Sequence, residues 1–466
     1  MTRSPDLADR PSRLIALASL LVAGLAIGAL MACWGGRVAH AQANQPPAGG
    51  ANNPPPPGGG PGGGTPPPQT PPGGAFEVEI RLPDLGREQA IPELPQRSEI
   101  GAIGDRIVML VPINEGGVVA ADYDLQVLGL ATLQSLGQDM VLAAPPSGLS
   151  PLEAISLVEL DPRVVVVQLD LPYALQRGPE QPGELAAAAG PDEIVEQLAR
   201  AEGVLIGLVD SAVEVGHPAL AGAAIELADV VKTPLEASDA AHGTAMAGAI
   251  LGGDQAGGEA RGARMLAIRA FSSGGAGGGA ARSATFAVAQ AIDLAAVRRV
   301  DVLNLSFAGP RDPIVIRLLS RAQQLGVLAI GAAGNAGPEA PPAYPAALPS
   351  VLAVTAIDGR DELFKRANRG AYVGLAAPGV DVIVAGPGGG YGISSGTSIA
   401  AAKVSGLAAA ILGQSAGLAP AALHDLLRQT AIDLGPAGPD EAFGAGKVDG
   451  DAARAAAQGL AGLKEG

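Results

Sequence analysis

After residue 192 the sequence alternates between apolar runs and helical segments, and this alternation restricts the fold more than any other feature. The helical segments, at 285–300 and 314–326, have apolar residues three and four positions apart. The strand-like runs are VLIGLVD (204–210), GARMLAIRAF (262–271), VDVLNLSF (300–307), GVLAIGAAGN (326–335) and SVLAVTAID (350–358). Strands that are apolar throughout and joined by helices indicate a mostly parallel sheet covered on both faces. We therefore predict an α/β fold of three layers.

The composition agrees with a covered sheet and argues against a nucleic-acid partner. Hydrophobic residues make up 48% of the 466 residues and aromatic residues only 3%, so the core must consist mainly of Ala, Val, Leu and Ile. A formal net charge of −16 offers no basic surface that could displace counterions from a phosphate backbone. We expect no nucleic acid to bind this chain.

The N-terminus has the pattern of an export signal. Three arginines precede an uncharged run at 14–34, and Ala39-His40-Ala41 has the small-x-small pattern that a signal peptidase cleaves. Residues 1–41 are therefore predicted to be a signal peptide or a membrane anchor, because 14–34 is also long enough to span a bilayer. A third reading is lipid attachment at Cys33, the only cysteine, whose isolation excludes an internal disulfide. We expect an exported protein, secreted or periplasmic, that meets a membrane only through this segment if it is retained.

Changes in composition divide the rest of the chain. Residues 42–99 begin with a Pro/Gly-rich stretch that has too little apolar surface to fold, so we predict a disordered linker. Residues 100–175 predict a small α+β domain with the order strand, helix, strand, helix, strand. A second linker at 176–191 is where a processing cut would fall. The main domain is predicted at 192–456, and a tail at 457–466.

Four polar side chains stand at predicted strand ends or helix starts of the main domain. Asp210 ends a strand, His242 begins the helix HGTAMAGAILGG, Asn335 follows a strand, and Ser398 opens the helix TSIAAAKVSG. Catalytic groups of such folds gather beyond the carboxyl ends of the strands. A serine can attack a carbonyl, a histidine can carry its proton, an aspartate can orient the imidazole, and an asparagine can donate to the oxyanion.

Each of the four residues also has a structural explanation. Asp210 could be an exposed turn residue, His242 a histidine at a helix start, Asn335 a left-handed turn residue, and Ser398 a helix cap. Taken singly, each of these explanations is the better one. Taken together they require four coincidences in one chain, so we favour a catalytic site.

The same stretches resemble the subtilisin-like serine proteases over roughly residues 192–456. The order Asp, His, Ser is that of this family. The sequence departs from the family pattern at three positions that carry no proton-transfer atom: Ala212, Ala245 and Ala402. The motifs that carry the resemblance are GLVDSAVEVGHPAL, HGTAMAG, VLNLSFAGP, GAAGNAGP, AAPGVDV and SSGTSIAAA.

The resemblance implies a serine endopeptidase with a subtilisin-like three-layer fold. Its triad would be Asp210, His242 and Ser398, with Asn335 as the oxyanion donor. The domain at 100–175 resembles the prodomain of these proteases, which implies a self-processing zymogen with an intramolecular inhibitor. The alternative that stays open is a catalytically silent or permanently self-inhibited binding protein on the same fold.

The resemblance also implies where a protein or peptide substrate would bind. Its backbone would add as an edge strand beside 305–309. The pocket for the residue before the cleaved bond carries no charge and should accept apolar or aromatic side chains. Its implied lining residues are Ser306, Phe307, Ala308, Ala333, Gly334 and Ala343. We predict no cofactor. Calcium is the open alternative, because relatives bind it in loops, but no clear motif supports it: the loop after the His242 helix offers only Asp254 and Glu259 as carboxylates.

Overall fold

The computed structural model describes residues 76–78, 105–176, 181–185, 201–232, 240–253, 255–272, 281–415 and 417–462. The predicted export segment and most of the two predicted linkers therefore lie outside the described residues. Within the ranges given, no helix combines the length and the hydrophobicity that crossing a membrane requires.

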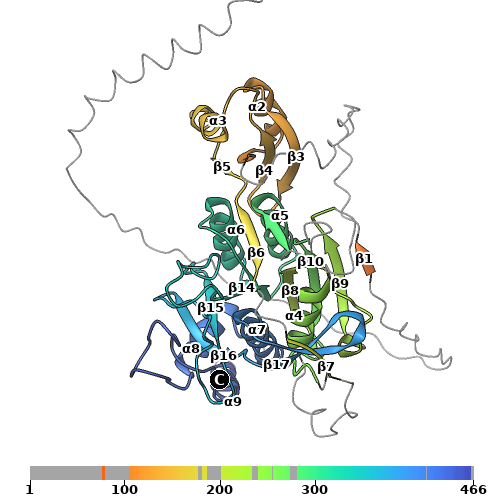
Figure 1. Cartoon of the computed structure of the whole chain (residues 1–466), viewed down its shortest axis with the longest axis vertical. Coiled ribbons are helices and arrows are strands. Elements are labelled where there is room, and N and C mark those ends of the chain that lie inside the picture. The colour runs from red at the N-terminus through yellow and green to blue at the C-terminus, as the bar shows by residue number, and fades with distance from the viewer. Residues whose placement is uncertain are drawn as a thin grey trace, which may run out of the picture. The chain divides into compact units, whose positions relative to one another are not determined.

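A parallel sheet of eight strands forms the centre of the main domain (Figure 1). Its order is β1-β9-β10-β8-β12-β14-β15-β16, and every neighbouring pair is parallel. The strands are β1 (Phe76–Val78), β8 (Leu205–Asp210), β9 (Ala224–Asp229), β10 (Arg264–Arg269), β12 (Val302–Leu305), β14 (Leu328–Ala332), β15 (Val351–Ile357) and β16 (Val373–Pro378). The predicted α/β fold class is thus confirmed, and each apolar run named above supplies one strand.

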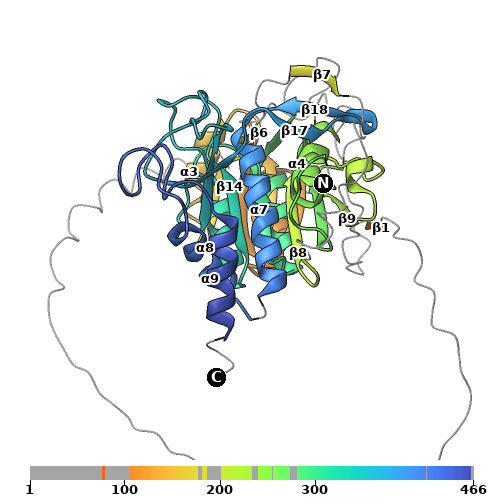
Figure 2. The same ribbon diagram turned by 90° about the horizontal axis from the view of Figure 1, so that it is seen from below.

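Helices cover both faces of this sheet. One face carries α4 (Ala241–Leu251) and α7 (Thr397–Gln414), flanked by α8 (Pro420–Gln429) and α9 (Gly450–Gly462). The other face carries α5 (Thr285–Val297) and α6 (Pro313–Gln324). In Figure 2, α7 runs along the strands with α9 beside it.

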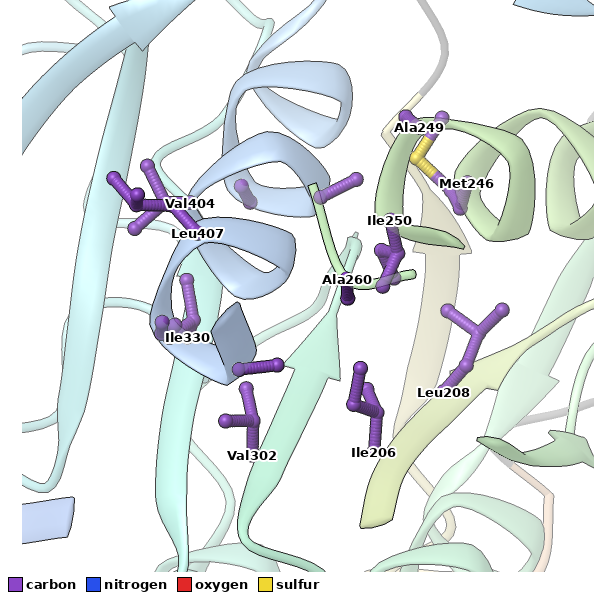
Figure 3. Packing of buried hydrophobic residues seen from close by; sticks show 14 of the residues in the cluster. Ile206, Leu208, Met246, Ala249, Ile250, Ala260, Val302, Ile330, Val404 and Leu407 are labelled. Atoms are coloured by element: carbon purple, nitrogen blue, oxygen red, sulfur yellow. The ribbon is translucent and has the colours of Figure 1, made fainter. Parts of the chain in front are cut away.

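Small residues allow α4 and α7 to pack closely over the sheet. Figure 3 shows Val404 and Leu407 of α7 beside Ile330, with Ile250 of α4 above Ile206. A β-carbon added at Gly406 would lie 2.8 Å from the carbonyl oxygen of Ile250, so only glycine permits this approach. This contact fixes the position of α7 relative to α4.

The predicted small domain folds around its own antiparallel sheet, in the order β3-β4-β2-β5. Its elements are β2 (Ile107–Pro112), α2 (Gly116–Asp122), β3 (Gln126–Leu133), β4 (Gln138–Ala144), α3 (Pro151–Val158) and β5 (Val166–Leu169). The helix α3 begins with a reciprocal cap between Ser150 and Glu153 and has Pro151 in its first turn. The two helices pack on one face of the sheet.

The sequence-based order of this domain was wrong by one strand. The chain runs strand, helix, strand, strand, helix, strand. The strand that was not predicted is β3, which forms a hairpin with β4. In β3 the buried and exposed residues alternate only irregularly, since the pairing register between β3 and β4 shifts near Gly129. A shifted register weakens the period of two by which a strand is recognised.

The second face of the small sheet packs against α5 and α6. The Asp293 carboxylate of α5 accepts hydrogen bonds from the N–H groups of Gln134 and Ser135, each at 2.9 Å, and from the Ser135 hydroxyl. Burial raises the pKa of Asp293, although these donors lower it. Arg321 of α6 donates to the carbonyl oxygen of Ser135 at 3.0 Å.

Two smaller sheets contain segments from before and within the main domain. One has the order β11-β6-β13, with β6 (Pro172–Leu175) between β11 (Arg282–Ala284) and β13 (Phe307–Ala308), antiparallel to both. The other has the order β17-β18-β7, made of β17 (Val382–Ala385), β18 (Tyr391–Ser394) and β7 (Gln181–Leu185). Both β6 and β7 come from the region just before the main domain.

Candidate active site

A buried aspartate–histidine pair lies at the carboxyl end of β8. Asp210 is the last residue of β8 and is 0% exposed, and His242 is the second residue of α4. The Nδ1 atom of His242 lies 2.8 Å from Oδ1 and 2.9 Å from Oδ2 of Asp210. The N–H of Ser211 donates to Asp210 Oδ1 at 2.7 Å. The exposed-turn explanation of Asp210 is therefore wrong.

The start of α4 is held against the end of β8 by local contacts. The N–H of Gly243 donates to the Ser211 hydroxyl at 2.9 Å, and the N–H of Glu214 donates to the Thr244 hydroxyl at 2.8 Å. A β-carbon at Gly243 would lie 2.4 Å from the carbonyl oxygen of Ala212, so this position requires glycine. These contacts orient the imidazole, whose Nε2 atom is buried and makes no hydrogen bond with the described residues.

Asn335 and Ser398 come together beyond the end of β14. The side-chain oxygen of Asn335 accepts from the N–H and the hydroxyl of Thr397, at 3.0 and 2.9 Å. Gly334 adopts the positive φ of this turn, 115°, and its N–H donates to the Thr397 hydroxyl at 3.1 Å. Asn335 is not left-handed, so its predicted structural explanation is wrong.

Ser398 is not the cap of its helix. The N-cap of α7 is Gly396, without a side-chain hydrogen bond, and Ser398 is the second helical residue, 2% exposed. The Ser306 hydroxyl donates to Oδ1 of Asn304 at 2.8 Å and also lies 3.3 Å from the carbonyl oxygen of Ser398. In the part of the chain that is described, no hydrogen bond links Ser398 to His242. The serine thus stands at a helix N-terminus, where the backbone dipole favours a developing negative charge.

Gln176, the residue that follows β6, lies in this site. The N–H of Gln176 donates to the carbonyl oxygen of Ser306 at 3.1 Å. The carbonyl oxygen of Gln176 accepts from Nδ2 of Asn335 at 3.0 Å, and its side-chain oxygen accepts from the N–H of Asn335 at 2.9 Å. Because β7 pairs with β18, chain segments on both sides of 177–180 are strands bound to the main domain.

Of the residues implied to line the substrate pocket, Phe307 and Ala308 contact β6 directly. Ala308 pairs with Ala174 of β6, and the Phe307 ring packs edge-on against Tyr173, with centroids 5.6 Å apart. The backbone of Ala333 accepts from the Tyr372 hydroxyl at 2.7 Å, next to Gly334. Ser306, Ala333 and Ala343 are all buried. The preference for apolar or aromatic side chains at the residue before the cleaved bond stays a prediction.

Two of the other histidines have structural surroundings. His217 is buried; its Nδ1 accepts from the N–H of Ala219 at 3.0 Å, and its Nε2 lies 2.7 Å from the carbonyl oxygen of Gly390. His424 contacts Asp425 on α8. His40 lies outside the described residues.

No group of three or more His, Cys, Asp or Glu side chains suited to a metal ion occurs among the described residues. Of the two loop carboxylates considered for calcium, Asp254 is outside the described residues, and Glu259 is paired with Arg454. The absence of a cofactor stays a prediction.

Sequence reasoning missed three residues that act on the candidate site: Thr397, Ser211 and Gln176. Thr397 orients the Asn335 amide, and Ser211 links Asp210 to the start of α4. Their positions next to Ser398 and Asp210 were a usable signal, because hydroxyl residues beside a catalytic group often supply its hydrogen bonds. Gln176 was placed only in a linker, and nothing in its local sequence indicates contact with Asn335.

The covered parallel sheet, the buried Asp-His pair and a serine at a helix N-terminus define a class of serine hydrolase. A model described as the subtilase family of peptidases matches residues 201–446, more than half of the chain, and the chain belongs to this family. It is a serine endopeptidase whose substrates are proteins or peptides.

Curated relatives and solved structures agree with this family. The chain is 30% identical over 306 residues to Subtilisin-like protease 1 of Trichophyton verrucosum and to that of Arthroderma benhamiae, covering 63% of this chain and 76% of each relative. Fervidolysin from Fervidobacterium pennivorans, a keratinolytic enzyme related to subtilisin, is similar in fold, with a TM-score of 0.62 at 22% identity over 75% of this chain. The match spans 61% of the fervidolysin chain. The protease domain of PatA matches 57% of this chain and 98% of its own, at 28% identity and a TM-score of 0.52.

Proposed function

We propose that this chain is made as a self-processing zymogen whose triad is Asp210, His242 and Ser398, with Asn335 as the oxyanion donor. The observation that carries this proposal is the hydrogen bond from Asn335 Nδ2 to the carbonyl oxygen of Gln176. An amide that stabilises an oxyanion must reach the carbonyl oxygen of the bond under attack. The chain's own carbonyl occupies that position.

Each side chain would have one role in peptide hydrolysis. The Ser398 oxygen attacks the carbonyl carbon, and its proton passes to Nε2 of His242, which has no competing partner among the described residues. Asp210 accepts the hydrogen bond from Nδ1 and stabilises the imidazolium. Asn335 donates to the oxyanion. The C–N bond then breaks, His242 protonates the leaving amine, and a water molecule hydrolyses the acyl-enzyme by the same route.

The small domain would inhibit the enzyme until it is cut off and released. Its sheet packs on α5 and α6, and its last strand, β6, fills the edge between β11 and β13. A substrate that adds to that edge would need the same backbone hydrogen bonds. Inhibition and substrate binding are therefore mutually exclusive in this proposal.

The test compares the full chain with Ser398→Ala. The length of the chain is followed over time, together with labelling by a fluorophosphonate that reacts with activated serines. We expect the parent to shorten by the mass of its N-terminal region and to be labelled at Ser398, and the variant to do neither. Ser156→Ala, which removes an exposed hydroxyl on α3, is the control and should behave as the parent. A folded parent that neither shortens nor becomes labelled, even after the small domain is removed by an added protease, would support the binding-protein alternative.

We also propose that the protein is exported. The support is the arginine-flanked apolar run at 14–34 and the cleavage pattern that ends at Ala41. Deleting 14–34 should retain the protein in the cytoplasm of a bacterial host, and the mass of the exported parent's N-terminal region, before self-cleavage, distinguishes a cleaved signal from a retained anchor. Export of the deleted form would refute the assignment.

A further inference from the structure

A tyrosine is buried three residues before Gln176. Tyr173 is 2% exposed, and its ring lies edge-on to Phe307 and opposite Gly309. A β-carbon at Gly309 would lie 2.5 Å from the Tyr173 ring, so the absence of a side chain there makes room for an aromatic ring. The main domain thus contains a built subsite for a large flat side chain.

A buried carboxylate forms the base of this subsite. The Tyr173 hydroxyl donates to Oδ2 of Asp312 at 3.0 Å, and Asp312 is 1% exposed. Burial and the Asp312 carboxylate raise the pKa of Tyr173 well above its ordinary value of 10, so the hydroxyl stays protonated and donates. A phenylalanine would place the same ring in the subsite but would leave the carboxylate without this donor.

Asp312 is shared between the small domain and the main domain. Its carboxylate accepts from the Thr285 hydroxyl at 2.6 Å and from the N–H groups of Ile314 and Val315 at 2.9 and 3.2 Å, all in the main domain. The small domain adds Tyr173 and the side-chain amide of Gln168, the latter at 3.0 Å. When the small domain leaves, the Asp312 carboxylate loses two of its five hydrogen-bond donors, those of Tyr173 and Gln168. A buried carboxylate that lacks donors favours a ligand that donates a hydrogen bond to it over an otherwise identical ligand that cannot.

Backbone pairing on both sides of β6 fixes the spacing between the tyrosine and the carbonyl at Asn335. Tyr173 pairs with Ser283 of β11, and Leu175 pairs with Phe307 of β13. A peptide that used the same hydrogen bonds would therefore place its tyrosine in the subsite when its third following residue presents its carbonyl to Asn335.

We propose that Asp312 selects substrates with a tyrosine three residues before the residue that supplies the cleaved carbonyl, and that the chain's own Tyr173-Ala174-Leu175-Gln176 is the first such substrate, cut after Gln176. This deepens the proposed function and rests on it. Asp312 is then a specificity-determining residue, and the mature enzyme begins at residue 177. The residue before this cut is Gln176, whose side-chain oxygen accepts from the N–H of Asn335, so the first substrate departs from the apolar or aromatic preference predicted for that position.

The experiment uses the full chain and the mature enzyme that it releases. N-terminal sequencing identifies the bond that is cut. The mature enzyme is then given two peptide p-nitroanilides, acetyl-Tyr-Ala-Leu-Gln and acetyl-Phe-Ala-Leu-Gln, which differ by one hydroxyl. We expect a new N-terminus at residue 177 and kcat/KM about 10- to 100-fold higher for the tyrosine peptide.

Variants separate recognition from folding. Tyr173→Phe in the full chain should slow self-cleavage by a similar factor, whereas Tyr123→Phe, which removes a hydroxyl elsewhere in the small domain, should not. Asp312→Asn should reduce the Tyr/Phe ratio toward one, and this ratio is independent of the fraction of enzyme that folds. If Asp312→Asn does not fold, the peptide pair on the parent enzyme still decides.

The outcomes distinguish this inference from the proposed function. An active, fluorophosphonate-labelled enzyme that treats the two peptides alike, or that cuts its chain elsewhere in 177–191, overturns the inference alone. A parent that is neither cut nor labelled overturns the proposed function as well.

Discussion

Replacing Asp210 with asparagine should abolish most of the activity while preserving the fold. The N–H of Ser211 donates to Oδ1 of Asp210, so the asparagine carbonyl oxygen will keep that position. Its NH2 group then takes the place of Oδ2, 2.9 Å from Nδ1 of His242. Nδ1 of His242 also lies 2.8 Å from Oδ1, but an N–H at the Oδ2 position repels a proton on Nδ1 and favours the tautomer in which Nδ1 accepts and Nε2 carries the proton.

This tautomer cannot take a proton from Ser398. Loss of the correct tautomer, with the surrounding geometry intact, costs about 10⁴ in kcat in triads of this kind, which corresponds to about 5.5 kcal/mol of the activation barrier. Self-cleavage of the full chain is the suitable assay, because it needs no added substrate and no prior removal of the small domain. A parent that matures in minutes should require weeks as Asp210→Asn.

The chain offers a matched control for this experiment. His424 and Asp425 form a second Asp–His contact among the described residues. This contact is exposed on α8, and no catalytic role is assigned to it. Asp425→Asn removes the same charge and should mature as the parent does. A folded Asp210→Asn variant that matures within a factor of ten of the parent would refute the role assigned to Asp210.

Three further outcomes follow from the contacts described. Gly243→Ala places a β-carbon 2.4 Å from a backbone oxygen, so it should lower the free energy of unfolding by about 1–3 kcal/mol in a denaturant titration, whereas Gly216→Ala, with open space around it, should change it little. Asp293→Ala leaves two N–H groups and a hydroxyl of the small domain without their acceptor and should weaken inhibition by the cleaved small domain about 10- to 100-fold; an unchanged inhibition constant would contradict the docking contact. Hydrogen bonds from Arg163 lower the pKa of Asp161 from 3.8 to about 2, so the stability that this pair contributes is present above about pH 4 and is lost as the pH falls toward 2. Asp161→Asn should flatten that part of the pH–stability curve measured by circular dichroism.

The main sheet was predictable because its signal is local. The strands β8, β10, β12, β14 and β15 lie in the apolar runs named in the sequence analysis, and each predicted catalytic residue stands at the end of such a run or at the start of a helix. The strands β1, β9 and β16 were not predicted; β9, for example, contains Glu226 and Asp229 and is only partly buried. The strand β3 was not predictable in the same way. Gly129 interrupts its pattern, and the structure gives the reason: the Phe286 ring of α5 lies 2.9 Å from where a β-carbon would be.

The contacts that make the candidate site specific depend on residues far apart in the chain. Gln176 meets Asn335 across 159 positions, and Tyr173 meets Asp312 across 139. In the sequence, Asp312 is a helix cap followed by Pro313, and it does cap α6. Its second role, toward a tyrosine, arises only when β6 enters the edge beside β13, which no local pattern records.

The covalent attachment of β6 to the rest of the chain has a consequence for how activity appears over time. While the connection is intact, the segment that fills the site is present at an effective concentration set by its tether, in the millimolar range for a short flexible one. After a single cut the same segment must find the site by diffusion, at the actual concentration of the protein. Activation would then have two stages: a first-order cut, and a dissociation that dilution favours. The cut enzyme would stay inhibited at high protein concentration and become active at low concentration.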